Sequence, residues 1–218
     1  MGIFDSLFGK KKDQNVAPVL PGEIYEAATL EFQDIIAPSA LKIDPKNLNL
    51  GEKVARTYFV ISYPRFLTDN WFTPIINLDK IFDISIYVHP IDTAKILRQF
   101  QKKVAEVQSQ INIRESKGLV RDPILDTAYQ DLESLRDSLQ QAQEKMFEFG
   151  LYITIYASGE PELFKVESEI KSILEAKQVY IKPALFQQEE GLKSSLPIGT
   201  DLLNVHQKLN SEPLSSLF

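Results

Sequence analysis

Hydrophobic and polar residues alternate with a period of two along several short stretches of the chain, which predicts β-strands. The clearest stretch is 81–88, whose apolar even-numbered positions would face a core. In 151–157 the odd-numbered positions are expected to point inward, with Tyr152, Thr154 and Tyr156 pointing outward. Further strands are predicted at 41–44, 54–62 and 178–182.

Two long segments instead have apolar residues at spacings of three and four, the period of an amphipathic helix. The first opens at Pro90 and ends at Gly118. The second begins at Asp122 and Pro123, an N-cap and first-turn pair, and its apolar residues form a heptad seam. Because only a short turn separates the segments, we expect an antiparallel helical hairpin at about 91–148. The seam residues are Leu125, Leu132, Leu135, Leu139 and Met146.

The order of the predicted elements indicates an α+β fold. Shorter helices are predicted at 70–77 and 160–176, so the order is strand, short helix, strand, helical hairpin, strand, helix, strand. This order corresponds to two βαβ halves, and we expect a ferredoxin-like sheet with the hairpin inserted between them. We divide the chain into a flexible arm at 1–30, the α+β domain at 31–183, and a linker at 184–218, in which 202–209 is weakly helical.

The start of the arm has the composition of an interfacial membrane anchor. Its apolar residues would share one side of a short helix, and three lysines follow at once. Each lysine near an anionic surface contributes about 1 kcal/mol of attraction. No apolar run in the sequence reaches the roughly 20 residues of a membrane span, so we expect peripheral membrane contact or a terminus without a binding role. The candidate membrane-contact residues are Ile3, Phe4, Leu7, Phe8, Lys10, Lys11 and Lys12.

Composition and motifs narrow the classes of function. The net charge of -6 argues against direct nucleic-acid binding, and the absence of cysteine excludes a thiolate zinc site and fits the cytoplasm. The stretch 191–194 has a Lys-Ser pair but no leading glycine loop for a phosphate. His89 and His206 are far apart and lack a metal-ligand spacing, and we interpret His89 as a capping or packing residue. We predict no catalytic, cofactor or metal residue and no enzymatic activity.

Three segments, taken in order, resemble the N-terminal region of the VirB/TraC-type ATPases of conjugation and type IV secretion. They are 83–92 (DISIYVHPID), 117–123 (KGLVRDP) and 191–199 (GLKSSLPIG), and the final residues, 215–218, fit the same register.

The resemblance implies a non-catalytic assembly or docking domain at the cytoplasmic face of the inner membrane, in contact with membrane components of a type IV secretion channel. Such motors are typically hexameric, and they bind ATP and Mg²⁺ through Walker motifs in a C-terminal motor domain. Neither Walker motif is present in these 218 residues, so 184–218 is expected to lead toward a motor domain that this sequence lacks.

Two other functions remain open from the residues alone. A stand-alone adaptor would bind partners through the helical hairpin, with a partner helix along the heptad seam. A small-molecule enzyme with an unrecognised site would have a buried carboxylate of perturbed pKa in a cleft.

Overall fold

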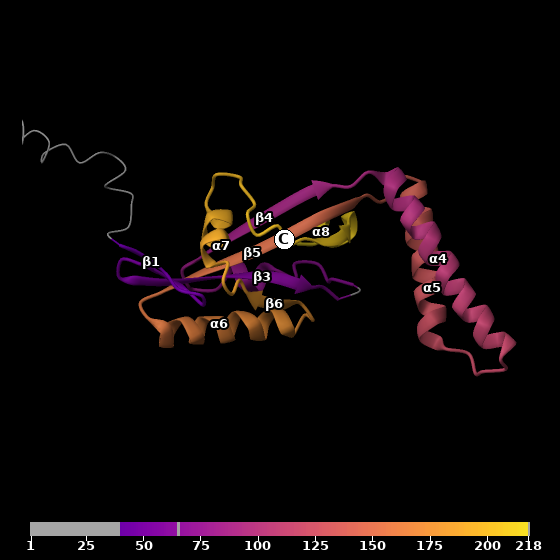
Figure 1. Cartoon of the computed structure of the whole chain (residues 1–218), viewed down its shortest axis with the longest axis horizontal. Helices are drawn as coiled ribbons and strands as arrows, with labels where there is room; N and C mark the ends of the chain where they lie inside the picture. Colours follow the sequence, from indigo (N-terminus) through magenta and orange to yellow (C-terminus); the bar gives the residue numbers. More distant parts are fainter. Residues whose placement is uncertain (1–39, 65, 218) are drawn as a thin grey trace, which may run out of the picture. The chain divides into compact units, whose positions relative to one another are not determined.

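The computed structural model describes residues 40–64 and 66–217, which form an α+β unit with an antiparallel sheet and an adjacent pair of helices (Figure 1). The strands described are β1 (Leu41–Ile43), β2 (Leu48–Leu50), β3 (Lys53–Ser62), β4 (Phe82–Pro90), β5 (Met146–Ala157), β6 (Tyr180–Pro183) and β7 (Gln207–Asn210). The helices described are α3 (Thr73–Ile76), α4 (Thr93–Ser116), α5 (Pro123–Gln140), α6 (Glu160–Glu175), α7 (Gln188–Ser195) and α8 (Ser211–Ser215).

Strand β5 organises the sheet. One edge of β5 pairs with β4 along nearly all of its length, and the other edge pairs with β3 and, near its start, with β7. The far edge of β3 is shared by β2 and β6. Every pair is antiparallel, and the strands that cross the unit lie in the order β6-β3-β5-β4.

Helix α6 covers one face of the sheet and forms the main core with it. The helix was predicted from one apolar stripe, and Leu163, Val166 and Ile170 of that stripe are buried. They pack against the odd-numbered side chains of β5, such as Ile153 and Ile155. Burial of each such side chain stabilises the fold by about 1.5–3 kcal/mol, so this interface supplies much of the driving force.

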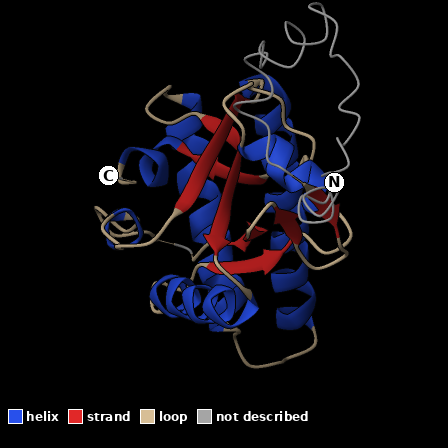
Figure 2. Cartoon of the chain, turned by 90° about the vertical axis from the view of Figure 1, so that its left-hand side faces the viewer, coloured by secondary structure: helices blue, strands red, loops and turns tan. Residues whose placement is uncertain are grey.

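The opposite face of the sheet is also covered, which corrects one prediction. Tyr152 and Thr154 were expected to point outward to solvent, but both are fully buried. Helix α7 and the segment after it pack on this face, so that helices lie on both sides of the strands (Figure 2). Helix α7 can lie close to β3 because Gly191 has no side chain. A Cβ at Gly191 would lie only 2.7 Å from the Cβ of Thr57 on β3.

The segment 184–218, expected to be a linker, contains regular elements in its described part. Helix α7 was not predicted, and the weakly helical stretch expected at 202–209 is wrong, because strand β7 pairs there with β5. Leu203 and Leu217 are buried against the rest of the unit. The expectation that this segment leads to a further domain stays a prediction.

The helical hairpin is confirmed as the adjacent pair α4 and α5, with two corrections to its ends. Pro90 is the last residue of β4, and α4 begins later because the Asp92 carboxylate accepts a hydrogen bond from the backbone N–H of Lys95 at 2.9 Å. Helix α5 ends at Gln140, and Met146 belongs to β5. The turn after α5 interrupts the heptad pattern, since Ala142 has a φ of 57°. No helix in the described residues is long and apolar enough to cross a membrane.

Candidate functional site

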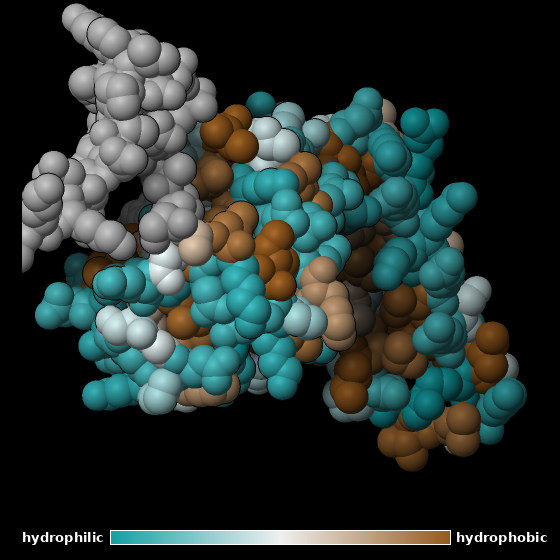
Figure 3. Space-filling model, turned by 60° about the vertical axis from the view of Figure 1, so that its left-hand side comes forward, coloured by the Kyte–Doolittle hydropathy of each residue, from teal (hydrophilic) through white to brown (hydrophobic). Residues whose placement is uncertain are grey.

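The end of the hairpin carries an exposed group of apolar side chains, which we call the apolar tip. The connection between α4 and α5 turns at Gly118, whose φ of 63° favours glycine. The Asp122 carboxylate then caps α5 by accepting the backbone N–H of Ile124 at 3.0 Å. The apolar tip consists of Ile113, Leu119, Val120 and Ile124, with exposed fractions of 52%, 51%, 85% and 79%. Apolar surface is visible at the end of the hairpin in Figure 3.

Polar contacts hold the apolar tip in place. The Arg114 guanidinium donates to the backbone carbonyl of Val120 at 3.4 Å and lies 3.7 Å from the carboxylate of Asp122. On the other side of the turn, Arg121 pairs with Asp126. These contacts connect the turn to the end of α4 and to the first turn of α5, so the exposed side chains are presented on a turn held at both ends.

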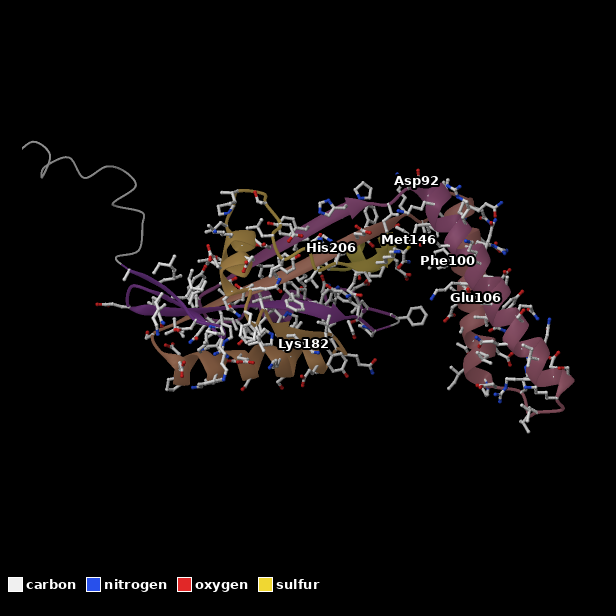
Figure 4. All side chains as sticks on the ribbon, in the orientation of Figure 1. Asp92, Phe100, Glu106, Met146, Lys182 and His206 are labelled. Carbon is white, nitrogen blue, oxygen red and sulfur yellow. The ribbon has the colours of Figure 1, made fainter. Side chains whose placement is uncertain are left out.

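Three of the five predicted seam residues, Leu135, Leu139 and Met146, pack together at the base of the hairpin. Leu139 and Met146 are buried with Ile96 of α4, and Leu135 and Phe100 pack against them. Figure 4 shows Phe100 and Met146 at this junction. Leu125 and Leu132 are half-buried. Helix α4 therefore contacts the base of the seam, whereas Leu125 and Leu132 keep part of their surface exposed.

The other predicted contact residues, Ile3, Phe4, Leu7, Phe8, Lys10, Lys11 and Lys12, lie outside the described residues.

The Lys-Ser pair that we compared with a phosphate loop is Lys193 and Ser194 of α7, and its surroundings differ from those of a phosphate-binding loop. Lys193 is on the exposed side of α7 and pairs with Glu189 at 2.6 Å. The Ser194 hydroxyl is buried and accepts the backbone N–H groups of Leu202 and Leu203 at 2.8 and 3.2 Å. This serine therefore fixes the return of the chain after α7.

That return brings together three residues that the sequence separates. His89 is on β4, while Asp201 and His206 are in the segment between α7 and β7. Their side chains can each place one ligand atom within 4.8 Å of the others. Nε2 of His206 lies 2.7 Å from Oδ2 of Asp201, and the ring centroids of His89 and His206 are 5.2 Å apart. We call these three residues the histidine cluster.

Neighbouring groups orient Asp201. The hydroxyl of Tyr152 donates to the carboxylate, with both oxygens at 2.9 Å, and the backbone N–H of Asn204 donates to Oδ1 at 2.9 Å. Burial raises the pKa of Tyr152 most; the hydrogen bond from Val205 lowers it, and Asp201 raises it further. Tyr152 is therefore a neutral O–H donor at physiological pH.

Sequence reasoning missed the histidine cluster for a physical reason. The two histidines have no local ligand spacing, and their contact depends on a long return of the chain over the sheet. The predicted strand began at Leu151, whereas β5 begins at Met146 and includes Gly150. A glycine inside a strand often marks a close approach of another group, so a longer predicted strand would have given one local indication. A Cβ at Gly150 would lie 2.8 Å from Cδ2 of His206, so this glycine makes room for the imidazole.

No protein-family model matches this chain, and no significant match was found among curated proteins.

Proposed function

We propose that this chain is a docking domain of a larger protein assembly and that the apolar tip of the hairpin is its contact surface. The observation that carries the proposal is the exposure of Val120 and Ile124, at 85% and 79%, on an ordered turn. Adjacent exposed apolar side chains on a well-ordered element are typical of protein-protein contact sites.

The expected gain from burial is large enough to matter for binding. Complete burial of one valine or isoleucine side chain is worth about 1.5–3 kcal/mol. The apolar tip offers four such side chains, while the Arg114 and Arg121 pairs beside them can form a polar rim.

We further propose a ferredoxin-like sheet with the hairpin as an insertion. The strand order β6-β3-β5-β4, with every neighbouring pair antiparallel, supports this arrangement. Between β3 and β4 the helical element is the short α3, whereas α6 lies between β5 and β6. The hairpin then connects β4 and β5, the position at which a simple sheet would have a tight turn.

The finer proposal is an N-terminal assembly domain of a type IV secretion or conjugation ATPase, at the cytoplasmic face of the inner membrane. It depends on the sequence resemblance carried by 83–92, 117–123 and 191–199. The middle segment forms the turn of the hairpin, so the resemblance includes part of the proposed docking surface. The partner would be a membrane component of the secretion channel, and the full motor would be a hexamer.

Site-specific photo-cross-linking in cells tests the docking surface. A photoreactive residue at Val120 of the full-length protein is expected to cross-link to an inner-membrane channel component. The same residue at Gln101, which is exposed on α4 several turns away from the apolar tip, is the matched control and should give little product. Equal cross-linking at both positions, or products with copies of the same chain only, would contradict the proposed contact.

The motor assignment has a separate test. The reading frame is expected to continue past Phe218 into a Gly-Lys-Ser/Thr phosphate loop. A stop codon directly after Phe218 would refute the motor assignment. The docking role would then still be decided by the cross-linking experiment.

A further inference from the structure

We propose that His89, Asp201 and His206 bind a divalent transition-metal ion of the zinc class. The proposal does not depend on the docking function. It starts from the geometry: one ligand atom from each residue can lie within 4.8 Å of the others. Two imidazole nitrogens and one carboxylate oxygen form a donor set that zinc accepts in proteins, whereas Mg²⁺ and Ca²⁺ prefer oxygen donors alone.

The histidine cluster needs only small movements to hold the ion: His89 would move closer, and the hydrogen-bonded pair of His206 and Asp201, now 2.7 Å apart, would separate slightly. Zinc-nitrogen bonds of about 2.0–2.1 Å in a tetrahedral site place ligand atoms roughly 3.4 Å apart. His89 is exposed on the edge strand β4, so rotation of its side chain toward the Asp201–His206 pair meets little resistance. Three protein ligands would leave one coordination position for water.

The surroundings hold two of the three ligands in place. The carboxylate of Asp201 is fixed by the hydroxyl of Tyr152 and by the backbone N–H of Asn204. The imidazole of His206 is held by its hydrogen bond to Asp201 at 2.7 Å and fits over Gly150, where a Cβ would collide with it. Outer groups that orient metal ligands in this way raise affinity, since less freedom is lost on binding.

A bound ion would connect two separate parts of the unit. Asp201 and His206 belong to the segment between α7 and β7, whereas His89 precedes the start of α4. The ion would therefore link the segment between α7 and β7 to strand β4, which precedes the hairpin. Its expected effect is stabilisation of the folded chain, because a ligand that binds only the native state shifts the unfolding equilibrium.

Zinc titration of the untagged, full-length protein is the direct experiment. The chain has two histidines and no cysteine, so any site with imidazole ligands must use His89 or His206. At Zn²⁺ concentrations about 100-fold above the dissociation constant, we expect the unfolding midpoint to rise by about 5–10 °C. In NMR spectra the imidazole signals of both histidines should shift at one equivalent of zinc, and Mg²⁺ should cause neither change.

Three variants separate this site from other zinc binding. His89→Gln removes an exposed ligand, and we expect it to fold normally and to lose at least about ten-fold in zinc affinity. Tyr152→Phe leaves all three ligands but removes the hydroxyl that orients Asp201, and a similar loss of affinity is expected. Glu189→Gln changes an exposed carboxylate of α7 and should bind zinc like the wild type.

Two results would overturn the proposal. One is a wild-type protein whose unfolding midpoint and histidine signals do not respond to zinc at 100 µM, a concentration of the order at which a micromolar site would be filled. The other is a His89→Gln variant that keeps the wild-type affinity, since the ion would then be bound by other groups.

Discussion

Arg56 and Glu167 form a buried ion pair between the sheet and helix α6. Nη1 of Arg56 lies 3.0 Å from Oε2 of Glu167, and Nζ of Lys171 lies 2.6 Å from Oε1. The exposed fractions of the Arg56 and Glu167 side chains are 6% and 11%. Removal of one partner from such a pair leaves an uncompensated charge next to the main core, which is strongly destabilising.

The first prediction concerns Glu167→Gln and its dependence on pH. Burial raises the pKa of Glu167, but the hydrogen bond from Lys171 and the positive charges of Lys171 and Arg56 outweigh it and lower the pKa overall. A lowered pKa in the folded state means that the ionised carboxylate stabilises the fold above its ordinary pKa and that this contribution is lost as the pH falls. At pH 7 the variant should lose about 3 kcal/mol of unfolding free energy.

Urea denaturation at several pH values measures this effect. The difference between wild type and Glu167→Gln should begin to shrink as the pH falls below the ordinary glutamate pKa of about 4.3, and it should reach its minimum only below the lowered pKa of the folded state. Glu169→Gln, at an exposed position of the same helix, should stay within about 0.5 kcal/mol of the wild type. A constant difference at all pH values would show that packing, and not charge, is responsible.

The helical hairpin has its own small apolar cluster, separate from the core of the sheet. Ile96, Leu139 and Met146 are buried together at its base, whereas β3, β5 and α6 share the larger core. An element with few buried apolar side chains opens at lower free energy than the core. The hairpin is therefore expected to open as a unit of its own.

The second prediction follows from this separation. Leu139→Ala creates a cavity at the base of the hairpin, where the leucine is 2% exposed, and should cost about 2–4 kcal/mol of local stability. Hydrogen exchange should become faster for the amides of α4 and α5, while the amides of β3 and β5 keep their protection. Leu119→Ala, in the exposed turn, is the control and should leave exchange in both helices unchanged. Equal acceleration in β5 would contradict independent opening.

Elements with strong local patterns could be predicted from the sequence, and those that depend on distant contacts could not. The alternating residues of β4 and the Asp122-Pro123 start of α5 act locally, so both elements were found. Helix α7 is short and contains Gly191, which is unfavourable in a helix and is explained only by the approach to Thr57. Strand β7 is also short, and its pairing with β5 joins segments far apart in sequence.

At the scale of the whole described unit, the sequence pattern did not indicate that the second face of the sheet is covered. Tyr152 and Thr154 alternate with apolar residues, a pattern that usually indicates a solvent-facing side. The Thr154 hydroxyl instead lies 2.7 Å from that of Thr57 and 2.6 Å from that of Ser195 of α7. A polar face that is satisfied by a later helix cannot be distinguished locally from one satisfied by water. The histidine cluster was missed for the same reason.

The last prediction tests whether the segment after β6 is part of the fold. Leu202 and Leu203 are neighbours of the same type, but Leu203 is 5% exposed and packs near Tyr152, whereas Leu202 is 44% exposed. Leu203→Ala should therefore lower the unfolding free energy by about 2–4 kcal/mol, and Leu202→Ala by well under 1 kcal/mol. Because Tyr152 is on the central strand, the loss should appear as one shifted transition in both circular dichroism and Trp71 fluorescence. An unchanged midpoint, or a separate early transition seen by only one probe, would show that the segment docks on a sheet that is stable without it, as a linker would.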